Sequence, residues 1–295
     1  MAEPGSGSRW LRRAIGHVPS GLLISLVIVT AAAWGLTIYS AVSMSMPMGI
    51  AVRGGTGMDD MAGMDMGGMA GMAMEGMAAG GWSVTGAFAF LAVWTIMMAA
   101  MMLPAASSMV FMFAAGQARR DRYVAIPTWI FVAGYILVWA AVGSVVYIVV
   151  GIGSDLATAL QPVQRSQWAP LALGATVVLA GLYQFTPIKR VCLVHCRSPL
   201  AFVALHWREG RLGALRMGFT HGMYCLGCCW ALFAVLVATG VMSLAWMLLL
   251  TLVVFAEKML PLGRRTAMVT GMALIVLGVV VGYGAVPMPW MVQQQ

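Results

Sequence analysis

Long apolar runs recur along most of this sequence and are the feature that most restricts its fold. The composition is 61% hydrophobic and only 9% charged, whereas soluble domains carry about 25% charged residues. A helix of about 20 apolar residues crosses a ~30 Å hydrocarbon core at a rise of ~1.5 Å per residue. The runs lie at about residues 20–42, 83–114, 124–152, 168–188, 215–239, 241–260 and 266–285. The sequence therefore predicts an all-α, polytopic membrane protein with about seven transmembrane helices. The runs at 215–239 and 241–260 are expected to be joined by a turn at Gly240.

The distribution of Lys and Arg predicts the orientation of these helices. If the N-terminus is cytoplasmic, alternation of seven spans leaves only Arg53 and Arg165, of 17 Lys and Arg, outside. Cytoplasmic loops carry such an excess of positive charge, so we expect a cytoplasmic N-terminus and an external C-terminus. The surrounding lipid bilayer is then a plasma membrane, such as the bacterial inner membrane. Because the cations lie between apolar runs, we exclude nucleic acid as a partner.

The chain divides into four predicted parts. Residues 1–43 form a basic leader and the first transmembrane helix, and residues 44–81 form an external Met-rich flexible loop. Residues 82–285 form a six-helix membrane metal-binding domain, and residues 286–295 form an external tail. A cleaved signal peptide at Ala31–Ala33 is the alternative for the first part, but its apolar core would be shorter, which favours a retained helix.

The external loop is a candidate copper collector. Of the 27 Met residues in the chain, eleven lie between Met44 and Met77. A thioether binds Cu(I) without losing a proton and stays available where thiols would form disulfides. A low-complexity linker is the alternative interpretation. The candidate loop ligands are Met58, Met61, Met64, Met66, Met69, Met72, Met74 and Met77.

A second candidate site lies within the fifth apolar run, in the segment His-Gly-Met-Tyr-Cys-Leu-Gly-Cys-Cys-Trp. Helical spacing of i, i+4 and i+7 places His221, Cys225 and Cys228 on one face. Cys229 follows Cys225 by a further i+4 step. Soft sulfur and imidazole donors suit Cu(I) best and Zn(II) next.

The second apolar run offers thioethers at membrane depth. Met97 and Met101 are spaced i, i+4, as are Met98 and Met102. Pro104, which donates no backbone hydrogen bond, is expected to kink this helix beside them. Packing is the alternative role for these four Met residues.

A third candidate cluster follows the fourth run. Cys192 and Cys196 share a helical face by i, i+4 spacing, with His195 nearby. The cations between residues 189 and 197 would favour the metal-binding thiolate form, or they anchor the helix at lipid headgroups. At the end of the sixth run, Glu257 is expected to form an interfacial charge pair with Lys258.

Three of these segments resemble domain-of-unknown-function family 2182. The resemblance spans about residues 82–284 and rests on Met97 to Pro104, Tyr183 to Pro199, and His221 to Trp230. That family is described as predicted metal-binding integral membrane proteins, related to membrane copper chaperones that load tyrosinase-like cuproenzymes. The resemblance implies a copper role and a client cuproenzyme or metallochaperone as partner.

The leading hypothesis is a membrane protein that acquires Cu(I) through the external loop and passes it by ligand exchange through Met, Cys and His sites. The sequence has no Walker motif, which favours a chaperone over a pump and a non-enzymatic role. The alternative is a thiol-disulfide oxidoreductase in which Cys225 and Cys228 exchange with Cys192 and Cys196. A third possibility is a structural partner within a larger oxidase assembly.

Overall fold

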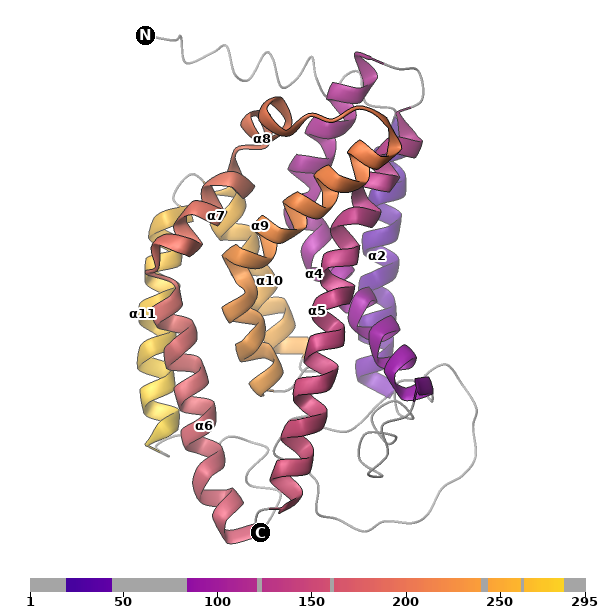
Figure 1. The fold of residues 1–295 in the computed structure, drawn as a ribbon. Helices are drawn as coiled ribbons and strands as arrows, with labels where there is room; N and C mark the ends of the chain where they lie inside the picture. The colour runs from indigo at the N-terminus through magenta and orange to yellow at the C-terminus, as the bar shows by residue number, and fades with distance from the viewer. Residues whose placement is uncertain are drawn as a thin grey trace.

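The computed structural model describes residues 20–43, 84–120, 124–159, 162–239, 244–260 and 263–283. In these ranges every regular element is an α-helix, as the sequence predicts (Figure 1). The leader, the Met-rich loop, the Gly240 turn and the C-terminal tail lie outside the described residues. The helices are α2 (Ser20–Ser43), α4 (Val84–Ala118), α5 (Ala125–Ala159), α6 (Pro162–Tyr183), α7 (Pro187–Arg197), α8 (Pro199–His206), α9 (Gly210–Thr239), α10 (Leu244–Met259) and α11 (Gly263–Gly282).

Five described helices are long and apolar enough to cross a membrane: α2, α4, α5, α9 and α11. The pair α6 and α7 makes a sixth candidate span, bent by 62° at its break. The sixth predicted run forms α10, which has only 16 residues, fewer than the ~20 that a full crossing needs. The structure thus supports five or six spans, and the seventh stays a prediction.

Helices α5 and α9 cross in close backbone contact. A Cβ atom at Gly218 of α9 would overlap the carbonyl oxygen of Phe131 in α5, and one at Gly134 would overlap that of Leu215. Small residues allow membrane helices to approach this closely. The contact fixes α9, which carries most of the predicted thiols, against α5.

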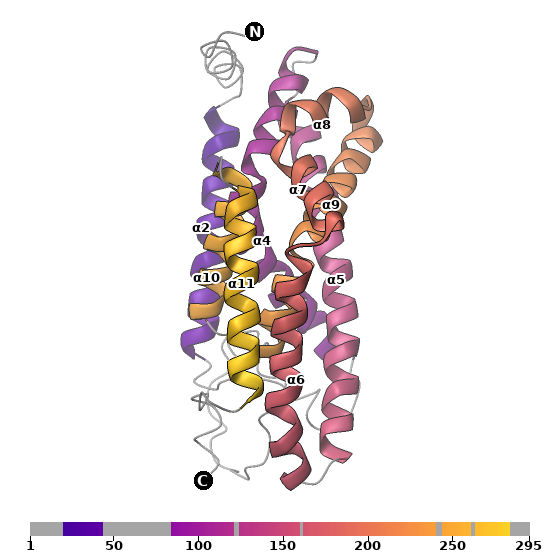
Figure 2. The same ribbon diagram turned by 90° about the vertical axis from the view of Figure 1, so that its left-hand side faces the viewer.

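Helices α6 and α11 lie side by side in both ribbon views (Figures 1 and 2). Their contact also depends on glycine, because a Cβ atom at Gly174 would overlap the carbonyl oxygen of Gly278. The two glycine-lined contacts define two tightly packed helix pairs, α5 with α9 and α6 with α11.

The break between α6 and α7 interrupts the fourth predicted run. Thr186 has extended backbone angles and its hydroxyl accepts a hydrogen bond from the Lys189 backbone N–H, so it caps α7. Pro187 follows at the first helical position, where its missing N–H costs nothing. The chain therefore restarts as a helix in a new direction, and α7 packs against α9.

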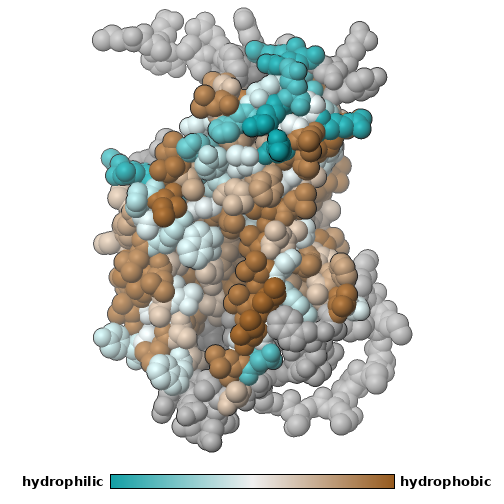
Figure 3. All heavy atoms as spheres, viewed as in Figure 1, coloured by the Kyte–Doolittle hydropathy of each residue, from teal (hydrophilic) through white to brown (hydrophobic). Residues whose placement is uncertain are grey.

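The outer surface is apolar over a broad band, as expected for a surface in contact with lipid (Figure 3). Large apolar side chains such as Val27, Leu179 and Val276 project outward there. Hydrophilic residues gather at the end of the molecule where α8 and the start of α9 lie (Figures 1 and 3). These features support a protein embedded in a membrane.

Candidate metal site

The predicted ligands of α9 all face the protein interior. His221, Cys225, Cys228 and Cys229 are each at most 2% exposed, so none of them faces lipid. Two of the thiols form hydrogen bonds within the helix: Cys228 and Cys229 each donate to the Cys225 carbonyl oxygen. The structure therefore places the four candidate ligands of α9 in the protein interior.

The most informative contact joins α7 to α9. The sulfur atoms of Cys196 and Cys228, which we call the thiol pair, lie 4.0 Å apart in the buried core. Two sulfurs bound at about 2.3 Å to one metal ion are roughly 3.8 Å apart at a tetrahedral angle and about 4.6 Å apart in a linear arrangement. The observed separation falls within this range, so one ion can bridge the two sulfurs with little movement.

Cys192 also faces α9, one helical turn before Cys196. Its sulfur lies against Gly227, where a Cβ atom would overlap it, and its side chain is only half-buried. The i, i+4 prediction for α7 is thus confirmed. The third predicted cluster, however, is not separate from the α9 cluster, because α7 brings its cysteines next to those of α9.

The Cys225 sulfur is held by two polar groups from other helices. Lys258 of α10 donates a hydrogen bond to it at 2.9 Å, and the Tyr135 hydroxyl of α5 lies 3.1 Å away. Both Lys258 and Tyr135 are buried. The predicted interfacial pair of Glu257 with Lys258 is therefore wrong: the burial of α10 turns Lys258 toward the thiols.

Glu257 instead pairs with Lys189 of α7. Their charged atoms are 2.7 Å apart and both side chains are 2% exposed; Lys189 also donates to Gln184, in the break before α7. The alternative that Lys189 anchors the helix at lipid headgroups is therefore wrong. Ionisable groups inside a membrane protein are costly, so they are paired and commonly functional.

His221 lies among aromatic rings beside the thiols. Its ring stacks on Tyr135 and Phe131 at centroid distances of 5.5 and 6.2 Å, and its Nδ1 atom is buried with no hydrogen-bond partner among the described residues. A nitrogen without a partner remains available as a ligand. His195, in contrast, contacts the Val191 carbonyl oxygen and stacks on Tyr224.

The predicted thioethers of α4 are buried in the same continuous core as the thiols. Met97, Met98, Met101 and Met102, the thioether group, are each at most 1% exposed. Helix α4 continues through Pro104. The sequence reasoning overlooked three more fully buried Met residues, although two carried a spacing signal: Met217 precedes His221 by i+4 and Met109 follows Met102 by i+7. They are Met109, Met217 and Met247.

The donors of the thiol pair are sulfur atoms, which suit soft metal ions. Among the residues that the structure describes, no three His, Cys, Asp or Glu side chains form a metal-binding group.

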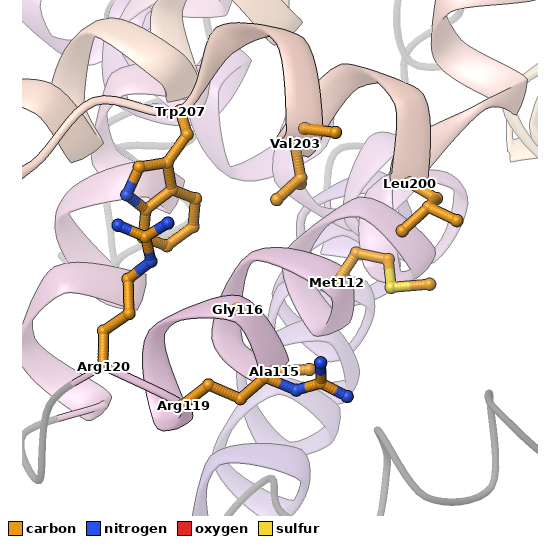
Figure 4. A pocket seen from close by; sticks show the side chains of 9 residues that line it. Met112, Ala115, Gly116, Arg119, Arg120, Leu200, Val203 and Trp207 are labelled. Carbon is orange, nitrogen blue, oxygen red and sulfur yellow. The ribbon is translucent and has the colours of Figure 1, made fainter.

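A separate hollow of about 240 Å³ lies between the end of α4 and α8 (Figure 4). Arg120 stacks over Trp207 there and pairs with Glu209 at 2.9 Å. Its lining contains none of the predicted metal ligands. We therefore assign it no part in metal binding.

Comparison with known proteins bears on this site. The sequence model of a protein family described as PpoB2, copper chaperone, matches residues 91–281. The matched range holds the thioether group and all five cysteines. It does not include the Met-rich loop. No curated protein and no solved structure matches the chain.

Proposed function

Because the chain belongs to the PpoB2 copper chaperone family, a metal-handling and not an enzymatic group, we propose that it binds Cu(I) at the thiol pair and delivers it to a client cuproenzyme. The observation that carries this proposal is the 4.0 Å separation of the Cys196 and Cys228 sulfurs in a buried site. Thiolate sulfur selects Cu(I) over harder ions. Burial keeps both the ion and the thiols from water.

The route to this pair is ligand exchange from weaker to stronger donors. Cu(I) is collected by the Met-rich loop, moves to the thioether group of α4 and ends on the thiols of α7 and α9. Thioethers are neutral and bind less tightly than thiolates, so the gradient runs toward the cysteines. The burial of the thioether group in the same core as the thiols supports this order.

The proposal includes the seven-span topology with a cytoplasmic N-terminus. Lys189 and Lys258 are buried partners of other side chains, so they no longer count as orientation charges. The remaining Lys and Arg still favour the same orientation, with Arg53 and Arg165 alone outside. The Met-rich loop then samples the external side, where copper enters.

Metal content of the purified protein tests the proposal. Wild-type protein, prepared under reducing conditions, is expected to retain Cu(I) in preference to Zn(II) and without haem. The double variant Cys196→Ser and Cys228→Ser is expected to lose that copper. Met223→Ser is the matched control, because it removes an outward-facing sulfur, 49% exposed, from the same helix. Equal copper content in wild type and the double variant would overturn the proposal.

A further inference from the structure

We infer that Lys258 is the specificity-determining residue of this site: its buried positive charge makes the thiol pair select monovalent over divalent soft metal ions. The inference rests on the proposed Cu(I)-binding function. It starts from the 2.9 Å contact between the Lys258 Nζ and the Cys225 sulfur.

The charges around the thiols can be counted. Lys189 and Glu257 face each other at 2.7 Å and cancel. In the described part of the chain no carboxylate pairs with Lys258, whose ammonium instead contacts a sulfur. Cys196, Cys228 and Cys229 are buried in the same core as Cys225. With the thiols protonated, one positive charge therefore remains in a buried sulfur environment.

Metal binding changes this balance in a way that depends on the ion. Two thiolates and one Cu(I) form a complex with a net charge of minus one, which the Lys258 charge neutralises. Two thiolates and one Hg(II) form a neutral complex, which leaves the lysine charge uncompensated. Because an uncompensated charge in a low-dielectric interior is costly, Lys258 favours the monovalent ion.

The position of Lys258 fits this role better than a packing role. A lysine that only filled space would be replaced at lower cost by an apolar side chain, since desolvating an ammonium is expensive. Its charged end reaches from α10 to a sulfur of α9, with the Tyr135 hydroxyl on the same sulfur. The charge is thus held on Cys225, which precedes Cys228 of the thiol pair by three residues in the same helix.

The test compares Cu(I) and Hg(II), two soft ions that both accept two thiolates. Their affinities are measured by competition with a chelator for wild type, Lys258→Met, Lys258→Gln and the charge-retaining Lys258→Arg. We expect the Cu(I)-to-Hg(II) affinity ratio to fall roughly 100-fold in the Met and Gln variants, as for one unit charge about 6 Å away at an effective dielectric of about 20. Lys258→Arg is expected to keep most of the ratio.

The outcomes separate this inference from the proposed function. An unchanged ratio in a folded Met or Gln variant overturns the inference and leaves copper binding intact. Failure of the wild type to bind Cu(I) at the thiol pair overturns the proposed function itself. A variant that merely misfolds loses both ions together, and the Gln variant, which keeps a polar end group, then provides the measurement.

Discussion

Cys196 and Cys228 are 32 residues apart in the chain, yet their sulfur atoms are 4.0 Å apart in the core. The contact exists because α7 restarts after the bend at Thr186 and packs on α9. The thiol-disulfide oxidoreductase alternative can also use this contact, for exchange of a Cys225–Cys228 disulfide with Cys196, so the two hypotheses are distinguished by which disulfide forms first.

Mild oxidation of the metal-free protein with a membrane-permeable oxidant is the first test of this distinction. We expect the disulfide to join Cys196 to Cys228, because these sulfurs need the least movement to reach bonding distance. Peptide mapping by mass spectrometry identifies the bond. Bound Cu(I) should protect the pair. A Cys225–Cys228 disulfide formed first would favour the oxidoreductase.

The buried pair of Lys189 and Glu257 should contribute strongly to stability. Lys189→Met or Glu257→Gln leaves one buried charge without its partner, which costs about 3–5 kcal/mol of unfolding free energy. Arg120→Met is the control, because its pair with Glu209 is exposed and worth about 1 kcal/mol or less. Unfolding titrations in detergent measure both, and equal losses would contradict the expectation.

The close crossing of α5 and α9 predicts a strict requirement for glycine. Gly218→Ala places a methyl group on the Phe131 carbonyl oxygen, and such overpacking costs about 1–3 kcal/mol. Gly35→Ala in α2 is the matched control, because nothing lies within 4 Å of its added Cβ atom. Thermal unfolding should show a clear loss for the first variant only.

The thioether group should affect the rate of loading more than the final content. Replacing Met97, Met98, Met101 and Met102 with Leu nearly conserves volume, so the fold should persist. We expect slower arrival of Cu(I) at the thiols with unchanged final stoichiometry. Met272→Leu is the control, since that side chain is 63% exposed. An unchanged loading rate would indicate that the four Met residues only pack in the core.

The Met-rich loop is tested by changing its eight candidate ligands to Ser at constant length. Copper acquisition should fall when copper is limiting and recover when copper is abundant, because the loop concentrates the ion without holding it tightly. Uptake into membrane vesicles at both concentrations measures this. Equal uptake at limiting copper would make the loop a spacer.

Helical spacing was sufficient to predict which candidate ligands share a helical face. The spacing grouped His221 with the α9 cysteines, and the two α7 cysteines with each other, and the structure shows the first group buried and the second facing α9. The sequence could not predict that these faces meet, because that depends on the 62° bend and on distant glycine contacts. Lys189 and Lys258 were also misassigned from the sequence as interfacial residues. A lysine near the end of an apolar run has the same sequence pattern whether it contacts lipid headgroups or a buried partner.

The thiol pair lies between the two glycine-packed helix pairs. Helix α7 continues from α6, which is packed on α11, whereas α9 is packed on α5. An ion held between Cys196 and Cys228 would add a bond between these two pairs, which are already joined by the packing of α6 and α7 on α9. The metal-bound protein would therefore be more rigid between the two helix pairs than the metal-free protein.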